Sequence, residues 1–349
     1  MPVPWVPRGV SFSSGGVRIL GQLGVLAYLR ENGLLDEVRD WYGCSGGAFT
    51  AFLGAIGVSA AWLRDAIKHM DMSRVVDIDE EKVADYMHHW GVNTGEALTD
   101  LLGQFAETWA PGVSKWTFAD FAREYPGVGL HFIATNVTGG FLTTFSVATT
   151  PDVLIMDAIR ASGCVPLFFT PWRDASGSLY CDGAVLEYFP WSCVTDKENT
   201  LVVACDDANI TGKKPTGTPL ETLGDYITRV FLIGNRKYVT QRPRNWIALN
   251  DRLVNFLDFS VSRDERIALF QLGERVAAAW LSFRAKHSDA SGGTPGNLPL
   301  SEGPHTLSSD RPSPDRRWDS QKSQNPVQPP SHSRGSHSAS SQRSRRWSL

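Results

Sequence analysis

The sequence predicts an α/β fold in which a mostly parallel central sheet is covered by helices. Short apolar stretches typical of strands alternate with longer segments whose apolar residues recur every three or four positions, as in helices. Such alternation is typical of parallel strands joined by helices. The stretch from Gly43 to Gly47 is the sharpest case, because an extended apolar lead, a tight turn and an apolar helical run follow one another there.

The individual elements follow from this spacing. The expected strands cover residues 9–12, 41–42, 130–135, 143–146, 179–181 and 201–204. The expected helices cover residues 18–32, 45–56, 60–71, 94–108, 117–125, 154–161, 220–237 and 263–286. Residues 220–286 are rich in Trp, Phe and Leu at helical spacing. We interpret them as helices packed on the core, with an acyl-chain cap or interfacial surface as the alternative, because aromatic stripes are more often core.

Residues 41–63 carry no charged side chain and are long enough to span a bilayer. The glycine-rich turn and Ser59 interrupt this stretch, and its helical part is only just long enough. A helix that is apolar on all sides is also typical of the centre of an α/β sandwich. We therefore predict a buried helix and no transmembrane span.

Ser45 lies at the centre of a Gly-x-Ser-x-Gly pattern formed with Gly43 and Gly47. A serine at a sharp turn between strand and helix is held out at the start of the helix, which is the geometry of a nucleophile elbow. Glycines on both sides permit the turn without side-chain clashes. Ser45 is therefore the candidate nucleophile, with an ordinary Gly/Ser turn as the alternative.

Three further segments carry candidate site residues. In Ser13-Ser14-Gly15-Gly16-Val17-Arg18, a glycine pair before a helix leaves N–H groups open at the positive end of the helix dipole. Such groups stabilise an oxyanion, although a plain turn between strand and helix uses the same residues. Asp182-Gly183-Ala184 places an acid at the end of an apolar stretch, where Asp-Gly is also a common turn. Between them, residues 158–171 run from a helix end into a loop punctuated by prolines.

Taken in order, the four segments resemble the patatin-like phospholipase family. Gly15-Gly16-Val17-Arg18 is similar to the family's glycine-rich oxyanion motif, Gly43-x-Ser45-x-Gly47 to its elbow, and Asp182-Gly183-Ala184 to its Asp-Gly-Gly/Ala motif. Residues 158–171 resemble its Ala-Ile-Arg-Ala-Ser segment, and residues 133–136 the strand that precedes it. As an ordered set, these motifs are far more specific than any one of them.

Two residues depart from the family's pattern. Ser14 stands where a third glycine is usual, and we expect it to change only the rim of the loop. Ile19 stands where glycine is usual after the arginine. A β-branched side chain beside the oxyanion site is expected to narrow the site or to shift the helix.

The resemblance implies a patatin-like three-layer sandwich and a Ser-Asp dyad in which Asp182 takes the proton of Ser45 directly. Burial raises the pKa of a carboxylate towards the working pH, so such a base is chemically reasonable. The remaining implied site residues are Gly15, Gly16, Val17 and Arg18 for the oxyanion hole, Gly43 and Gly47 for the elbow, and Gly183 and Ala184 beside the base. The implied reaction is cleavage of a phospholipid or other acyl-ester lipid through an acyl-enzyme, at a peripheral membrane surface, without metal or cofactor.

The eight histidines are poorly placed to complete a triad. Three lie in a predicted helical insertion (His69, His88, His89) and three in the C-terminal tail (His305, His332, His337). His131 begins a predicted strand and His287 ends a predicted helix, so we interpret both as structural or surface residues.

Other functions fit the sequence less well than the dyad. An α/β-hydrolase with a Ser-Asp-His triad has several strands before its elbow, whereas here only one strand and one helix precede Ser45. A nucleotide-binding loop at residues 13–18 is disfavoured, since no Gly-Lys-Ser/Thr follows and no second-strand acid stands in the right context. A non-catalytic lipid- or partner-binding relative, and an acyltransferase that uses the same dyad, remain alternatives.

Length and composition predict one catalytic domain with attachments. We expect the catalytic domain at residues 8–194, an α-rich extension packed on it at 195–287, and a disordered tail rich in Ser, Pro and Arg at 288–349. The tail carries eight basic residues against five acidic ones. Binding to anionic lipid, binding to nucleic acid and phosphorylation are the alternatives that this composition allows. The favoured interpretation is a solvated tail without a binding role, so the sequence makes no strong case for binding to nucleic acid.

Five cysteines occur singly within apolar segments, at Cys44, Cys164, Cys181, Cys193 and Cys205. Their odd number and the lack of a Cys-x-x-Cys pair indicate reduced thiols and argue against a metal cluster. Residues 1–8 do not have the pattern of a secretory signal. We therefore expect an intracellular, cytoplasmic protein that associates peripherally with membranes.

Overall fold

The computed structural model of the protein describes residues 5–76, 86–205, 243–249 and 256–286. All of them belong to one compact unit that extends from Met1 to Leu298. The helix expected at 220–237, the tail expected at 288–349 and four histidines lie outside the described residues (His287, His305, His332, His337).

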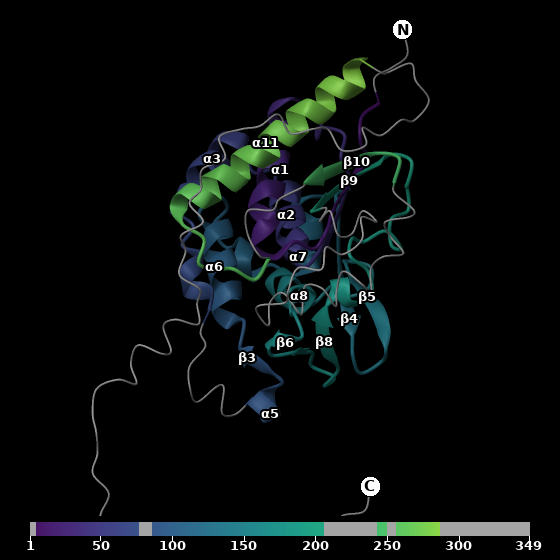
Figure 1. Ribbon diagram of the computed structural model, residues 1–349. Coiled ribbons are helices and arrows are strands. Elements are labelled where there is room, and N and C mark those ends of the chain that lie inside the picture. Colours follow the sequence, from purple (N-terminus) through teal and green to yellow (C-terminus); the bar gives the residue numbers. More distant parts are fainter. Residues whose placement is uncertain (1–4, 77–85, 206–242, 250–255, 287–349) are drawn as a thin grey trace, which may run out of the picture. The chain divides into compact units, whose positions relative to one another are not determined.

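The centre of this unit is an eight-stranded mixed sheet (Figure 1). Five neighbouring strands are parallel, in the order β10 (Trp246–Leu249), β9 (Thr200–Cys205), β1 (Gly9–Phe12), β2 (Asp40–Cys44) and β4 (Gly129–Asn136). Three more pair in antiparallel fashion, namely β5 (Phe141–Phe145), β8 (Leu179–Asp182) and β7 (Trp172–Arg173). The prediction of a mostly parallel central sheet is confirmed.

The pairing along β4 brings the ends of two strands together. β2 pairs with the first part of β4 as far as Cys44 opposite Ile133, and β8 pairs with the second part from Asp182 opposite Ala134. β5 pairs with β4 from Phe132 to Asn136, a range that overlaps the pairings of both β2 and β8. β5 must therefore lie along one edge of β4, and β2 and β8 share the opposite edge. The chain segments that follow β2 and β8 therefore leave the sheet at the same point.

Helices connect these strands. The described α-helices are α1 (Ile19–Glu31), α2 (Gly46–Ala55), α3 (Ala60–His69), α5 (Tyr86–His89), α6 (Glu96–Glu107), α7 (Phe118–Glu124), α8 (Ile155–Ser162) and α11 (Arg263–Lys286). Short 3-10 turns are η1 (Gly16–Arg18), η2 (Met72–Val75), η3 (Val113–Lys115) and η4 (Gly183–Val185). A separate two-stranded sheet joins β3 (Gly91–Asn93) to β6 (Leu167–Phe169).

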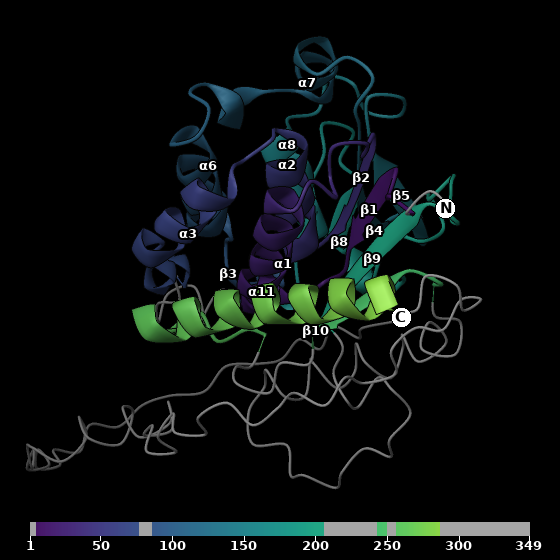
Figure 2. The same cartoon turned by 90° about the horizontal axis from the view of Figure 1, so that it is seen from above.

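The two faces of the sheet are covered differently. Leu201 and Val203 of β9 belong to the main core beneath the helices, and Figure 2 shows α1, α2 and α8 on one side of β1, β2 and β4. Val202, the next residue in β9, points to the other face and packs with Phe189 and Trp246. On the same face, Ala184 of the 3-10 turn that follows β8 packs against Cys44 and Ile133.

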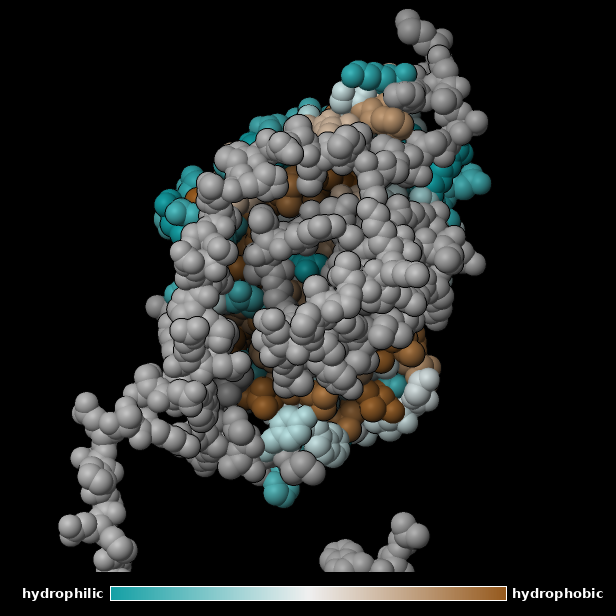
Figure 3. Space-filling model, in the orientation of Figure 1, coloured by the Kyte–Doolittle hydropathy of each residue, from teal (hydrophilic) through white to brown (hydrophobic). Residues whose placement is uncertain are grey.

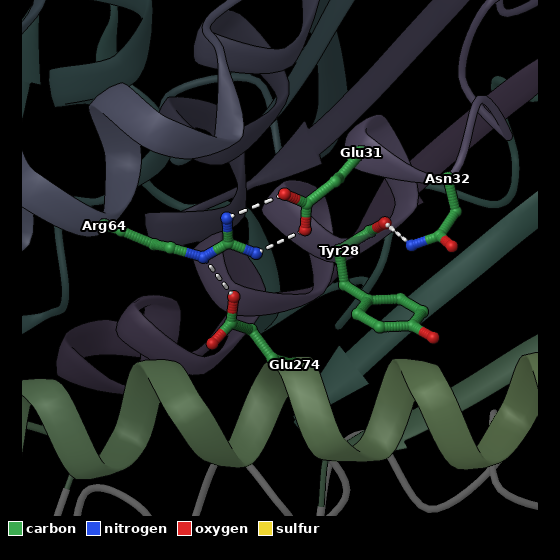
Figure 4. A network of polar contacts seen from close by, with 5 residues as sticks. All are labelled: Tyr28, Glu31, Asn32, Arg64 and Glu274. Carbon is green, nitrogen blue, oxygen red and sulfur yellow. Dashed lines mark hydrogen bonds and ion pairs between the residues drawn. The ribbon is translucent and has the colours of Figure 1, made fainter.

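Helix α11 lies across α1, with α3 beside it (Figures 1 and 2). The backbones of α1 and α11 touch, since a Cβ on Gly24 would stand 1.9 Å from the carbonyl oxygen of Phe270. Arg64 of α3 binds both helices: Nη2 lies 2.6 Å from Oε2 of Glu31, and Nε lies 2.7 Å from Oε1 of Glu274 (Figure 4). Nearby, the amide of Asn32 donates to the carbonyl of Tyr28 and closes the end of α1.

The stretch weighed as a membrane span forms β2, α2 and α3. Helix α2 is buried at every residue from Gly47 to Ala55, so the prediction of a buried helix is confirmed. Among the described residues, no helix is both long enough and apolar enough to cross a membrane.

The segment after residue 194 contributes to the same sheet as the segment before it. β9 and β10 extend the sheet beyond β1, and α11 packs on α1. The domain boundary at residue 194 stays a prediction. β10, β3, β6 and β7 were not anticipated, because each is four residues or shorter and lacks an apolar alternation of its own.

Candidate active site

Ser45 occupies a strained turn between β2 and α2. Its backbone has φ 55° and ψ −129°, a conformation that non-glycine residues rarely adopt. The flanking glycines are required by close packing: a Cβ on Gly43 would stand 2.3 Å from Cα of Ala48, and one on Gly47 would stand 2.4 Å from the carbonyl oxygen of Ser13. The turn therefore has the geometry of a nucleophile elbow.

Ser162, the last residue of α8, supports this turn. The N–H of Ser45 donates to Oγ of Ser162 at 2.7 Å, and Oγ of Ser162 donates to the carbonyl of Ile133 at 2.6 Å. All three residues are buried. Ser162 thus connects the elbow to β4, a role that the sequence analysis did not assign to it.

Asp182 ends β8 beside Ser45, as the pairing along β4 requires. Its carboxyl group lies near enough to the side chain of Ser45 for that hydroxyl to lower its pKa, and Oδ1 accepts the N–H of Ala184 at 2.8 Å. Its backbone is fixed too, because its N–H donates to the carbonyl of Cys164 at 2.8 Å and its carbonyl accepts the hydroxyl of Thr135 at 3.0 Å. The two side chains that the sequence analysis paired are therefore in contact.

Burial changes the protonation of Asp182. Only 1% of this residue is exposed, and loss of hydration raises the pKa of its carboxyl group to about 7. The hydrogen bonds from Ser45 and Ala184 act in the opposite direction, since they stabilise the carboxylate. A carboxylate with a pKa near neutrality can accept a proton from a hydroxyl group and return it.

The glycine loop between β1 and α1 lies against the elbow. Of the four N–H groups that the sequence analysis placed in an oxyanion hole, two have acceptors in the protein: Val17 donates to the carbonyl of Phe256 at 2.9 Å and Arg18 donates to that of Gly15 at 3.0 Å. Within the described part of the chain, the N–H groups of Gly15 and Gly16 donate to no protein acceptor. Gly16 lines the same pocket as Ser45.

A buried glutamine holds this loop. Nε2 of Gln22, on α1, donates to the carbonyl of Ser13 at 2.8 Å, and its Oε1 accepts the hydroxyl of Thr50 on α2 at 3.3 Å. Ser13 is fixed further because its Oγ accepts the N–H of Cys205 at 3.0 Å. Gln22 thus joins the glycine loop to the nucleophile helix. This role was not predicted, although Gln22 is a polar residue within the apolar spacing of the helix expected at residues 18–32.

The pocket at Ser45 is narrow and apolar. Ser45 is the one residue with a hydroxyl or charged side chain among the described residues that line it. The other side chains of the wall are Ile19, Met72, Leu98, Leu102, Ile159, Val165, Phe169, Leu257 and Phe259. A larger cavity of about 670 Å³ lies beside β3, α6 and β7, and neither Ser45 nor Asp182 lines it.

The described histidines take no part in the site. None of them lines the pocket at Ser45. His131 lies on β4, where its ring stacks on Tyr42 and its Nε2 is 3.2 Å from Oδ1 of Asp40. Cys44, next to the nucleophile, is fully buried, and loss of hydration and the neighbouring carboxylates raise the pKa of its thiol well above the usual value.

Metal ligands are not gathered at this site. Among the described residues, no group of three or more His, Cys, Asp or Glu side chains is placed to hold a metal ion. All five cysteines carry free thiols.

Comparison with known proteins gives consistent matches. The family model for patatin-like phospholipases matches residues 10–192. The uncharacterized protein R571 of Acanthamoeba polyphaga mimivirus is 22% identical over 277 residues, covering 76% of this chain and 91% of that protein. The probable lipid hydrolase 463L of Invertebrate iridescent virus 6 is 25% identical over 178 residues, covering 51% of this chain and 60% of that protein.

A solved structure shares the fold. The crystal structure of VipD from Legionella pneumophila matches with a TM-score of 0.50 and 18% identity, over 79% of this chain and 67% of VipD. The family model spans more than half of the 349 residues and includes both the elbow and the Asp-Gly-Ala segment. The protein therefore belongs to the patatin-like phospholipase family, a family of lipid hydrolases.

Proposed function

We propose that the protein is a serine lipid acyl hydrolase in which Ser45 is the nucleophile and Asp182 the general base. The observation that carries this proposal is that Ser45 stands at a strained elbow beside the buried carboxyl group of Asp182, whose pKa burial raises to about 7. A serine hydroxyl is a weak nucleophile unless an adjacent base accepts its proton.

In the proposed reaction, the carbonyl carbon of a lipid ester lies at Oγ of Ser45 and its oxygen at the N–H groups of Gly15 and Gly16. Asp182 accepts the proton as Oγ attacks, and the charge on the carbonyl oxygen is stabilised by the two amides and the N-terminal end of α1. Collapse of the tetrahedral intermediate expels the alcohol, which takes the proton from Asp182. Water then attacks the acyl-enzyme by the same route and releases the fatty acid.

The apolar pocket supports a fatty acyl substrate, because its walls offer dispersion contacts and no charge. We further propose that the protein works at a lipid surface. On the face shown in Figure 3, apolar residues gather in the region where Figure 1 places β6 and β8. Leu167 in β6 and Val185 just after β8 are exposed, at 43% and 37%. Exposed apolar side chains next to a site are favourable contacts for a lipid interface.

An active-site fluorophosphonate with a fluorescent tag tests the nucleophile. We expect it to label the folded wild-type protein at Ser45, and labelling to disappear in Ser45→Ala. Asp182→Asn should slow labelling strongly while circular dichroism remains unchanged. Absence of labelling in folded wild-type protein would contradict the enzyme and favour a non-catalytic lipid-binding relative. Labelling together with acyl transfer to an added alcohol in preference to water would indicate an acyltransferase.

A further inference from the structure

Ile19 lies beside the nucleophile in the apolar pocket. It begins α1 directly after the glycine loop, and its side chain is buried. Its Cγ2 atom occupies the space beside the elbow, because a Cβ on Gly46 would stand 2.2 Å from it. Gly46 follows Ser45 in the chain, so the branched side chain lies within one residue of the nucleophile and lines the same pocket.

The position of Ile19 is fixed. Its N–H donates to the carbonyl oxygens of Gly16 and Val17, which ties its backbone to the glycine loop. A β-branched side chain in a helix has one strongly preferred χ1 rotamer. Ile19 therefore cannot turn away from the elbow as readily as an unbranched side chain can.

The rest of the pocket differs from this rigid point. The pocket has only about 40 Å³ of free space, so an acyl chain longer than a few atoms must displace wall side chains. Met72 in that wall is unbranched and adapts its shape easily. The wall at Met72 can therefore yield to a chain more readily than the wall at Ile19 beside Ser45.

We propose that Ile19 is a specificity-determining residue, which restricts the acyl group to chains without a branch next to the ester carbonyl. This inference rests on the proposed function. A substituent on the first carbon of the acyl chain would meet Cγ2 of Ile19 while the carbonyl carbon is held at Ser45. A straight chain presents only a methylene group there and passes into the pocket.

The test compares kcat/KM for p-nitrophenyl hexanoate and p-nitrophenyl 2-methylhexanoate, each divided by its rate of hydrolysis by hydroxide. One added methyl group in a tight apolar pocket changes kcat/KM by about 10- to 100-fold, and we expect the wild type to prefer the straight ester by that factor. Ile19→Ala should reduce the preference at least about tenfold, mainly by faster cleavage of the branched ester. Ile19→Leu keeps the side-chain volume but moves the branch one carbon further from the backbone, so it should give an intermediate preference. It is the test variant if Ile19→Ala does not fold.

Val25→Ala is the matched control, because Val25 is a buried β-branched residue of the same helix that does not line the pocket. It should leave the preference unchanged. An unchanged preference in active Ile19→Ala or Ile19→Leu, or an equal loss in Val25→Ala, would overturn the role of Ile19 and leave the proposed function standing. No turnover of any ester by wild type, together with no labelling of Ser45, would overturn both.

Discussion

The nucleophile elbow and the glycine loop touch each other, yet the protein positions them in different ways. The elbow has contacts with its own neighbours, since Gly43 packs on Ala48 and the N–H of Ala48 donates to the carbonyl of Ser45, and one distant support from Ser162. The loop is held from distant parts of the chain: the N–H of Cys205 donates to Oγ of Ser13, and the carbonyl of Phe256 accepts the N–H of Val17. The difference indicates that the elbow is encoded more locally than the loop, which depends on tertiary packing at both Ser13 and Val17.

The largest effect is expected where the elbow meets the base. Asp182→Asn keeps an acceptor for the N–H of Ala184 but removes the proton acceptor of Ser45, so kcat should fall by at least about 1,000-fold with the fold intact. Steady-state hydrolysis of a soluble ester measures this. His131→Gln is the control and should retain nearly full activity. Substantial activity in Asp182→Asn, or a large loss in the histidine variant, would reject the dyad.

Loss of the support under the elbow should have the next largest effect. Ser162→Ala leaves the buried N–H of Ser45 without its acceptor, which costs about 1–3 kcal/mol. We expect kcat to fall by about 10- to 100-fold, because a small displacement of the nucleophile is costly. Ser162→Thr keeps a hydroxyl and should restore part of the activity. Wild-type kcat in Ser162→Ala would show that the elbow holds its shape alone.

A change in the loop should be milder and of a different kind. Gln22→Met keeps the volume but removes the donor to Ser13, so the amides of Gly15 and Gly16 lose their fixed position. We expect kcat to fall by about tenfold while KM changes little. Binding of a boronic acid transition-state analogue should weaken in parallel with kcat. A rise in KM with unchanged kcat would mean that Gln22 serves substrate binding and not the oxyanion.

Stability should reveal the cost of burying the base. The folded pKa of Asp182, about 7, exceeds the ordinary value of about 3.9, so the folded protein binds more protons than the unfolded chain between these values. The contribution to stability is therefore fully present below about pH 4 and is lost as pH rises to about 7, a change on the order of 4 kcal/mol. Asp182→Asn removes this penalty, so its melting temperature should exceed that of wild type at pH 8 more than at pH 5. A constant difference between the two pH values would contradict the raised pKa.

The same contrast explains what the sequence could predict. Ser45, Asp182 and the elbow glycines were identifiable because short motifs fix their backbone, and β1 and α11 have the expected bounds because their apolar spacing is clear. Ser162 and Gln22 were missed as supports, since each acts through partners more than 100 residues away or on another helix. The carbonyl of Phe256, which accepts the N–H of Val17, is likewise far from the loop in the sequence, so the motif could not predict this contact, and the oxyanion hole itself stays a prediction.

The pH dependence of Ser45 phosphonylation tests the central claim most directly, because it reports the proton acceptor without the later steps of turnover. Pseudo-first-order rates with a neutral fluorophosphonate are measured from pH 5 to pH 9 for wild type and Asp182→Asn. Since the pKa of Asp182 is raised to about 7, the wild-type rate should increase about tenfold per pH unit below that value and level off above it. The variant should react slowly without this transition. A wild-type rate that is flat over the range, or the same transition in Asp182→Asn, would contradict Asp182 as the base that activates Ser45.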